Sequence, residues 1–404
     1  MRKKYHSLVI VGLILVTVIF AVSIGLARLR SNSSQQLASR QIVEKETEEC
    51  PLNGKFYTKK QQDIWQKRRP LGIMVDNAAG ARPQSGLSEA DVVYEAAIEA
   101  GVTRFLAVYY CQSSEIVGPV RSVRTYFLDV ASEYGSFPLI AHVGGANTPG
   151  RANALGQIKE YGWGLYNDLD QFKIGFPTFW ADYDRTGKDV ATEHAIYTST
   201  LRLWDLAARE RKLTNQQIDR ITRKGSNWDE EFRRWKFKSD LAYDQRSKEF
   251  AAEIAFYSGR SATTKDYMVV WQYDPKSNSY LRLNGGQKLI DQSTGEQLAA
   301  KTVVLLQMKT YPAGDGYIEE GLGYHLVYGT IGRGVAEVLM DGKVVEGTWS
   351  KKSRTNRTMF LDEQGDELSF NRGLIWVELL PSGHTVTFGV GKAKTVNPDN
   401  WRSF

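Results

Sequence analysis

Two arginines stand three residues apart in the segment Gly118-Pro-Val-Arg121-Ser-Val-Arg124, and guanidinium groups at this spacing could bind an anion. Residues three apart share one face of a helix, and the first turn of a helix is electropositive. Two cations in that position therefore require an anionic partner. The partner is either an internal carboxylate, Glu95 or Glu99, or a bound carboxylate or phosphate group. The sequence leaves both alternatives open.

Polar residues also follow an apolar segment, residues 71–75, that is typical of a buried strand. Asp76 and Asn77 come directly after it, and Arg82 stands in the next loop. Because ligands of α/β folds bind beyond the ends of strands, these side chains are candidates for a ligand-binding face, together with Arg104. The alternative is a structured loop in which Arg82 pairs locally.

A third polar group is the segment His142-Val-Gly-Gly145-Ala-Asn147, which follows a predicted strand and precedes a predicted helix. Its glycines permit a close approach of the backbone to a ligand, so the turn is a candidate anion cradle that includes Asn147. His142 is either a general acid or base or a core histidine satisfied by the backbone.

The same residues permit an enzymatic interpretation. In a hydrolase or transferase, His142 or His194 would act as the acid or base, and Glu95 or Glu99 would supply the carboxylate. The chain has no Gly-x-Ser-x-Gly and no His-Glu-x-x-His motif, so the corresponding serine hydrolases and metalloproteases are excluded.

We expect neither a metal nor a cofactor. The segment from Asp182 to Glu193 has acidic residues and a glycine at the positions of a calcium-binding loop. However, Pro177 and aromatic residues precede it where such a loop needs an incoming helix, so the calcium interpretation is the weaker one.

The elements that would position these residues are mixed in the first half of the body. Val123, Phe127, Val130 and Tyr134 recur every three or four residues, which predicts a helix. Ala100 and Gly101 separate two apolar segments and predict a hairpin. We expect strands at residues 71–75, 92–99, 102–111 and 137–143, and helices at 121–134, from Asn147 onward and at 201–223.

The second half is β-rich. Short apolar segments alternate with turns such as Asn284-Gly285 and Asp341-Gly342, as in a mostly antiparallel domain. The expected strands are residues 252–257, 267–273, 302–308, 324–328, 334–340, 358–361 and 374–380. The predicted fold class is α+β, with a mixed α/β domain at 50–215 followed by a β-rich domain at 216–404.

The N-terminal residues 7–27 are uncharged and apolar, and this length is sufficient to span a membrane. We expect an uncleaved transmembrane signal anchor, preceded by a cytoplasmic segment at 1–6 and followed by a polar, flexible linker at 28–49. A cleaved signal peptide is the alternative, but its apolar part is normally shorter. Basic residues flank the anchor almost equally, so the charge bias leaves the orientation open.

The chain contains two cysteines, Cys50 and Cys111, which in an oxidising compartment would form a disulfide between the end of the linker and an apolar strand. Its net charge is +6, and it contains no run of five or more basic residues. No nucleic-acid-binding motif is present, so we expect no nucleic-acid partner.

Several segments together resemble the YerB-like family of bacterial envelope proteins. In chain order they are Arg69-Pro-Leu-Gly-Ile-Met-Val-Asp76-Asn77, Ala81-Arg-Pro-Gln-Ser-Gly-Leu-Ser-Glu-Ala-Asp91, Tyr94-Glu95, Gly101-Val-Thr-Arg-Phe105, Gly118-Pro-Val-Arg-Ser-Val-Arg124, His142-Val-Gly-Gly145, Tyr280-Leu-Arg-Leu-Asn-Gly285, Gly347-Thr-Trp349 and Gly373-Leu-Ile-Trp376-Val-Glu-Leu-Leu-Pro381. The resemblance extends from about residue 60 to the C-terminus.

The resemblance implies a two-part α+β protein whose body lies outside the cell membrane, held by the N-terminal helix. It carries no established activity, and it transfers no catalytic residue. We therefore expect a binding or accessory protein of the envelope, related to peptidoglycan, whose partner is a cell-wall polymer or an envelope protein. One basic, partly open pocket would contain Arg82, Arg121, Arg124 and His142.

Overall fold

The computed structural model describes residues 22–24, 44–135, 137–187, 189–218, 224–256, 262–317, 323–389 and 394–395. It separates into two units, Met1–Glu46 and Thr47–Phe404. Of the predicted anchor, only residues 22–24 are described, and they are helical. The rest of the anchor, the segment 1–6 and most of the predicted linker lie outside the described residues. No helix in the described part of the chain is long and apolar enough to cross a membrane.

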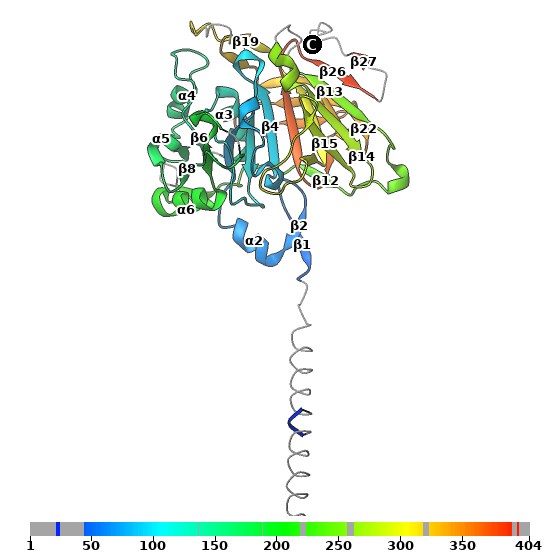
Figure 1. Ribbon diagram of the computed structural model, residues 1–404, viewed down its shortest axis with the longest axis horizontal. Coiled ribbons are helices and arrows are strands. Elements are labelled where there is room, and N and C mark those ends of the chain that lie inside the picture. Colours follow the sequence, from blue (N-terminus) through cyan, green and yellow to red (C-terminus); the bar gives the residue numbers. More distant parts are fainter. Residues whose placement is uncertain are drawn as a thin grey trace, which may run out of the picture. The chain divides into compact units, whose positions relative to one another are not determined.

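The body is built on a ten-stranded sheet in the order β23-β22-β21-β18-β25-β4-β5-β3-β6-β7 (Figure 1). Its strands are β3 (Leu71–Asp76), β4 (Val92–Ala97), β5 (Thr103–Tyr109), β6 (Leu139–His142), β7 (Asp168–Asp170), β18 (Thr302–Gln307), β21 (Gly332–Met340), β22 (Lys343–Lys351), β23 (Met359–Leu361) and β25 (Ile375–Leu380). Every residue of β3, β4, β5, β18 and β25 is buried. Mostly apolar strands that are buried at every residue are typical of a sheet covered on both faces.

Strands of both predicted domains share this sheet. β25 pairs in parallel with β18 on one side and with β4 on the other. A strand from near the C-terminus thus lies beside one of the first strands of the body. The boundary predicted at residues 215 and 216 does not coincide with an edge of the sheet, and Thr47–Phe404 form one compact unit.

A second, seven-stranded sheet is formed wholly by the later part of the chain, in the order β16-β15-β14-β13-β26-β27, with β17 pairing to β15. Its strands are β13 (Ala251–Ala255), β14 (Val269–Asp274), β15 (Ser279–Asn284), β16 (Gln287–Lys288), β17 (Ala299–Ala300), β26 (Thr385–Phe388) and β27 (Lys394–Thr395). In β14 buried residues alternate with less buried ones, as expected for a sheet with one face on the core.

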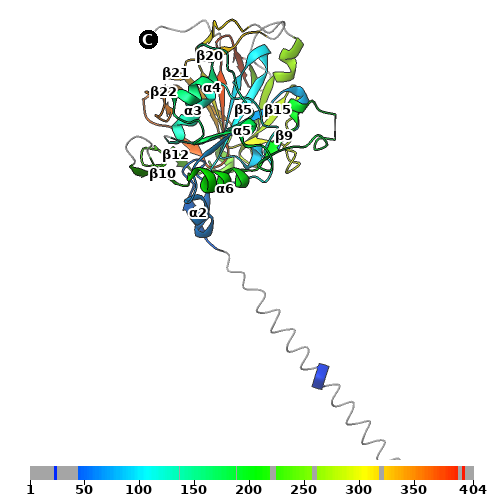
Figure 2. The ribbon, with the colours of Figure 1, turned by 90° about the vertical axis from the view of Figure 1, so that its left-hand side faces the viewer.

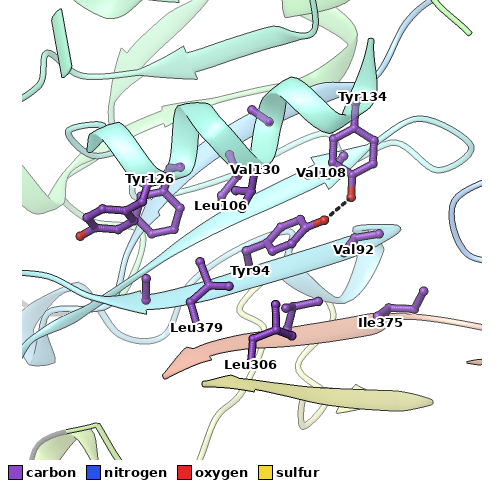
Figure 3. Packing of buried hydrophobic residues seen from close by; sticks show 14 of the residues in the cluster. Val92, Tyr94, Leu106, Val108, Tyr126, Val130, Tyr134, Leu306, Ile375 and Leu379 are labelled. Carbon is purple, nitrogen blue, oxygen red and sulfur yellow. Dashed lines mark hydrogen bonds between the residues drawn. The ribbon is translucent and has the colours of Figure 1, made fainter. Parts of the chain in front are cut away.

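Two apolar clusters cover the two faces of the ten-stranded sheet. On one face, Tyr126 and Val130 of α3 pack over Val92 and Tyr94 of β4, and the Tyr94 hydroxyl lies 2.7 Å from that of Tyr134 (Figure 3). Figure 2 shows α3 and α4 side by side. On the other face, the seven-stranded sheet and α6 pack against the alternate residues of the same strands.

The helices are α2 (Lys59–Trp65), α3 (Thr125–Ala131), α4 (Ala154–Glu160), α5 (Gln171–Ile174) and α6 (Thr200–Arg211). Short 3-10 helices occur at η1 (Ala79–Ala81), η2 (Leu87–Glu89), η3 (Glu99–Gly101), η4 (Ser132–Tyr134), η5 (Thr192–His194), η6 (Tyr243–Gln245) and η7 (Ala262–Tyr267). Two-stranded sheets pair β1 (Glu46–Glu49) with β2 (Phe56–Thr58), β8 (Phe179–Ala181) with β9 (Ile196–Thr198), β10 (Gln216–Ile218) with β11 (Gly225–Asn227), β12 (Lys236–Lys238) with β24 (Ser369–Asn371), and β19 (Thr310–Pro312) with β20 (Leu326–Tyr328).

Four sequence predictions need correction at their ends. The helix expected at 121–134 begins only at Thr125, because the preceding residues are extended and bridge to β3 and to Gly145. The helix expected at Asn147 begins at Ala154. The helix expected at 201–223 ends at Arg211, and β10 follows. The linker predicted to reach residue 49 ends earlier, because its last residues form β1.

Candidate functional site

Three parallel strands of the large sheet end at the same edge. β3 pairs in parallel with β6, and β6 pairs in parallel with β7. The C-terminal ends of these strands carry Asp76, His142 and Asp170, the last residue of each. Side chains that follow such ends are placed together, and this is where α/β folds bind ligands. The sequence predicts this gathering for the loops that follow Asp76 and His142.

The segment 118–124 crosses this edge in an extended conformation. Val120 bridges to Val75, and Val123 bridges to Gly145. The Arg121 N–H donates to the Met74 carbonyl at 3.0 Å. Arg121 therefore lies between the ends of β3 and β6 on extended backbone, and the predicted explanation from a helical first turn is wrong for it.

The Asp76 carboxylate is the centre of the polar group at the end of β3. His194 Nδ1 lies 2.9 Å from Asp76 Oδ2, and Arg121 Nε lies 3.3 Å from the same oxygen. The Ala78 N–H donates to Oδ1 at 3.0 Å. Burial acts to raise the pKa of Asp76, but the His194 hydrogen bond and the charges of Arg104 and Arg121 outweigh it, so the pKa is lowered. Asp76 is thus an ionised carboxylate shared by a histidine and an arginine.

Arg121 and His194 connect this carboxylate to solvent. The Asp76 side chain is 1% exposed, whereas the exposed fractions of Arg121 and His194 are 29% and 17%. Arg121 makes no side-chain hydrogen bond to any described residue, and its Nε is a buried nitrogen without a hydrogen-bond partner. Its guanidinium group therefore retains donors that an incoming anion could use.

Arg124 has an internal partner. It is the N-cap residue of α3, and its Nε and Nη2 donate to Glu99 Oε1 and Oε2 at 2.8 and 2.7 Å. Burial disfavours its charge, but the Glu99 hydrogen bonds outweigh burial and raise the pKa of Arg124. Of the two alternatives that the sequence left open for this arginine, the structure contains the internal ion pair.

Arg104 is buried and pairs in strand register with Asp76. Its Nη1 donates to the Ser122 carbonyl at 2.8 Å, which ties β5 to the crossing segment. Burial lowers the pKa of Arg104 to about 10. Arg104 therefore supports the site from the interior, and its guanidinium group is not exposed at the surface.

His142 lies in the core. Its side chain is 0% exposed, its Nε2 is 2.7 Å from Asp168 Oδ1, and its Nδ1 is 2.8 Å from the Gly144 carbonyl oxygen. Lys173 Nζ donates to the other oxygen of Asp168 at 2.7 Å. Burial favours the neutral acid, but the His142 and Lys173 contacts outweigh it and lower the pKa of Asp168. His142 thus matches the core alternative, here with a carboxylate in addition to the backbone partner.

Arg82 and Asn77 form the loop that follows Asp76. Arg82 Nε donates to Asn77 Oδ1 at 3.0 Å, and its Nη1 donates to the Asp266 carbonyl at 2.9 Å. The guanidinium carbon lies 4.9 Å from the centre of the Tyr267 ring. Arg82 therefore pairs locally and joins the loop to the segment before β14, which is the alternative named from the sequence.

Glu95 belongs to a buried ion cluster that the sequence analysis missed in part. Arg282 of β15 donates to Glu95 Oε2 and to Glu378 Oε1, each at 2.6 Å, and all three side chains are 0% exposed. The Trp271 and Trp376 rings lie 5.0 Å from the Arg282 guanidinium carbon. The available signal was a charged residue inside each apolar strand, in Tyr280-Leu-Arg-Leu and in Ile375-Trp-Val-Glu.

One carboxyl of this cluster holds a proton. Burial raises the pKa of Glu378 well above its ordinary value, and the neighbouring Glu95 charge raises it further. A single guanidinium group can balance only one of the two carboxylates, so Glu378 is the neutral member. The cluster joins the two sheets and is closed to solvent, so it cannot serve as an acid–base pair for an external substrate.

The remaining predicted residues have simpler surroundings. Asn147 is exposed in the loop before α4, and the helix is capped instead by Asn153. The predicted disulfide between Cys50 and Cys111 is present. Among the described residues, one group of acidic and cysteine side chains is close enough to hold a metal ion, but it contains these same two cysteines with Asp91.

The contacts of these side chains reduce the number of candidate ligand-binding residues. Arg82, Arg104, Arg124 and His142 have partners within the body. Arg121 and His194, which meet at Asp76, are the members that combine charge or proton-transfer capacity with exposure. The arrangement can bind an anion, and the histidine–carboxylate pair can also accept or donate a proton.

The chain is similar to proteins of one family over most of its length. The family described as "Protein of unknown function (DUF3048)" matches with its N-terminal domain at residues 57–214 and its C-terminal domain at residues 260–377. The protein described as "Putative lipoprotein YerB" of Bacillus subtilis is 27% identical over 344 residues, which are 85% of this chain and 89% of that protein. The crystal structure of YerB from Bacillus subtilis has a TM-score of 0.64 at 24% identity and covers 84% of this chain and 100% of the solved chain, so the fold is shared.

Proposed function

Because the chain belongs to the YerB-like family described as DUF3048, we propose that it is an envelope-associated binding or accessory protein that holds an anionic group at Arg121 and His194. The relative from Bacillus subtilis, YerB, is described as a lipoprotein, which supports association with a membrane. The proposed anchor is the apolar segment 7–27, with the body on the extracytoplasmic side.

The observation that carries the proposal is that the side chains of three of the four arginines at this edge donate hydrogen bonds to internal acceptors, whereas that of the fourth donates none to a described residue. Arg82, Arg104 and Arg124 donate to internal acceptors. Arg121 is the most exposed partner of Asp76 and makes no side-chain hydrogen bond within the described residues. A guanidinium group with free donors beside an extended backbone is suited to carboxylate or phosphate recognition.

The binding proposal is tested by titrating the full-length chain, in detergent micelles, with inorganic phosphate and sulfate by calorimetry. Arg121→Ala should weaken phosphate binding roughly tenfold to a hundredfold, since hydrogen bonds to charged groups contribute about 1.5–3 kcal/mol. Arg209→Ala is the matched control, because Arg209 is exposed and pairs only with Asp205 on its own helix. Equal phosphate affinity in the wild type and Arg121→Ala would refute the proposal.

The location is tested separately. Protease added to intact spheroplasts should digest the body if it lies on the extracytoplasmic side. Full protection, with digestion only after lysis, would place the body in the cytoplasm and contradict this part of the proposal.

A second candidate is a hydrolase or transferase, and the His194–Asp76 pair favours it over the other histidines. In this pair the carboxylate orients the ring through Nδ1, which leaves Nε2 for a substrate or water. No serine, threonine or cysteine of the described residues hydrogen-bonds to His194, so the attacking group would be water. Release of product from a cell-wall substrate that is lost in His194→Ala, but not in Arg209→Ala, would support the enzyme over the binding protein.

A further inference from the structure

The two most exposed large apolar side chains of the described residues lie beside this edge. Phe176 is 83% exposed and Phe172 is 76% exposed. Both belong to the short segment that follows β7, the third of the parallel strands. Aromatic side chains are enriched at binding surfaces, so two exposed phenylalanines at a strand end that also carries a charged group mark a candidate binding surface.

This segment is held rigidly. The Asp170 carboxylate accepts from the backbone N–H of Phe172 at 3.3 Å and from that of Gly144 at 3.1 Å. Lys173 binds Asp168 at 2.7 Å, and the Gly175 N–H donates to the Gln171 carbonyl at 2.8 Å. Rings presented on a fixed backbone lose less entropy on binding than rings on a mobile loop. The exposure of these phenylalanine rings therefore follows from the fixed backbone of this turn.

The backbone connects these rings to Arg121. The Arg121 carbonyl accepts from the Val143 N–H at 3.2 Å. The next residue, Gly144, lies against Phe172, so that a Cβ at Gly144 would be 3.0 Å from the ring. Arg121 and Phe172 are thus two neighbouring segments apart, roughly 10 Å at the spacing of paired strands. One extended ligand could contact both.

We propose that Phe172 and Phe176 stack against sugar rings of an anionic polysaccharide whose acid group binds Arg121. The proposal rests on the anion site at Arg121 and adds the ligand class to it. A pyranose ring offers an apolar C–H face to an aromatic ring and hydroxyl groups to polar neighbours. The surface offers this alternation, because the half-exposed Lys173 stands between Phe172 and Phe176 in the chain.

Charge and composition favour a glycan over the other occupants. A bilayer with anionic lipids attracts clusters of unpaired Lys and Arg, but Lys173 is already paired with Asp168 and Asp170. Large contiguous apolar patches mark the sites of protein partners, whereas the charged Lys173 stands between these two rings in the chain. A membrane or a protein partner would therefore leave the polar groups between the rings unexplained.

The test measures binding of the full-length chain to soluble, uncrosslinked peptidoglycan strands, which carry both sugar rings and carboxylates. Phe172→Ala and Phe176→Ala should each weaken strand binding about tenfold and leave phosphate affinity within twofold of the wild type. Arg121→Ala should weaken binding of both probes. Tyr243→Ala is the matched control, because Tyr243 is 62% exposed at another site. Thermal unfolding of each variant checks the fold.

The remaining outcomes separate the two proposals. Unchanged strand affinity in both phenylalanine variants overturns the glycan inference, while the anion site stands if Arg121→Ala still loses phosphate. If poly-L-glutamate binds as tightly as the peptidoglycan strands, the sugar rings do not contribute to recognition. If a neutral N-acetylglucosamine oligomer binds as tightly, the charge does not contribute. Binding to phosphatidylglycerol vesicles that depends on Phe172 and Phe176 would replace the glycan by a lipid surface.

Discussion

At the scale of single residues, the two arginines of one motif have different environments. Arg124 makes two hydrogen bonds to Glu99, and both side chains are at most 13% exposed. Arg121 has one longer contact and is more exposed. Their shared spacing in Gly118–Arg124 suggested a common task, but Arg121 stands on extended backbone and Arg124 caps a helix.

We therefore predict opposite consequences for the two alanine variants. Arg124→Ala leaves Glu99 without its main cation and should lower the free energy of unfolding by about 3 kcal/mol, as for other pairs removed from solvent. Arg121→Ala should change it by less than about 1 kcal/mol, as expected for a partly exposed pair. Chemical denaturation measures both, and equal losses would contradict this assignment.

The buried cluster of Glu95, Arg282 and Glu378 permits a matched pair of substitutions. Glu378→Gln keeps the neutral state that Glu378 already has, so at about pH 4, where the unfolded chain is largely protonated as well, its free energy of unfolding should stay within about 1 kcal/mol of the wild type. Glu95→Gln removes the charge that balances Arg282 and should cost about 3–5 kcal/mol. A larger loss in Glu378→Gln than in Glu95→Gln would reverse the assignment of the proton.

The pH dependence follows from the same proton. The pKa of Glu378 is raised above 4.5 by burial, so above pH 4.5 the folded chain retains a proton that the unfolded chain releases. This contribution to stability is present at low pH and decreases as the pH rises towards the raised pKa. Glu378→Gln should remove that slope, and denaturation curves recorded between pH 5 and about 9 would detect it.

Sequence reasoning at this scale identified residue types more reliably than their partners. It placed Asp76 among the candidates because this residue follows a predicted strand, Arg121 because of its spacing to Arg124, and His194 because a histidine can act as an acid or base. It did not pair His194 with Asp76, since 118 residues separate them. Arg282 and Glu378 were missed because a charged residue in an apolar strand carries no sign of which distant strand will face it.

At the scale of elements, the strands were predicted better than the helices. Strands such as β3, β5, β18 and β25 are buried along their whole length and mostly apolar, so their composition identifies them in the sequence. The helix at 121–134 was extended too far towards the N-terminus because Val123 fits the helical spacing. In the fold Val123 instead bridges to Gly145, a tertiary contact that the local pattern does not contain.

One glycine in the long hairpin allows a further prediction. A Cβ at Gly347 of β22 would lie 2.1 Å from the Leu361 carbonyl oxygen of β23. Gly347→Ala should therefore separate these strands and lower the free energy of unfolding by about 1–3 kcal/mol. Gly164→Ala is the control, because nothing lies within 4 Å of its Cβ. Similar melting temperatures for both variants would show that the edge strand yields without cost.

At the scale of the whole molecule, the pairing of β25 with β4 and β18 makes one body from two sequence segments. The family matches divide the chain much as its composition does. Composition could not reveal that the later segment supplies half of the large sheet, because pairing between distant strands leaves no local pattern. The α+β class was predictable from element types, and the shared sheet was not.

A body of this kind should unfold as one cooperative unit. We predict a single calorimetric transition for residues 47–404, with equal calorimetric and van't Hoff enthalpies. The chain truncated after residue 215 should fail to fold, because β4 would lose the neighbour that pairs with it along its length. Two resolved transitions, or a soluble cooperative fragment 47–215, would contradict the single unit.

The position of β25 also governs the order of events while the chain is being made. The ribosome releases β4 early and β25 almost last, so nearly the whole body must emerge before their ladder can close. Until then β4 presents an open edge that can pair with other chains, and the contact itself is of the long-range kind that forms slowly. The free edge of β4 is therefore exposed throughout synthesis of the chain. Until β25 is available to pair with it, either a chaperone must cover β4 or β4 must remain unfolded.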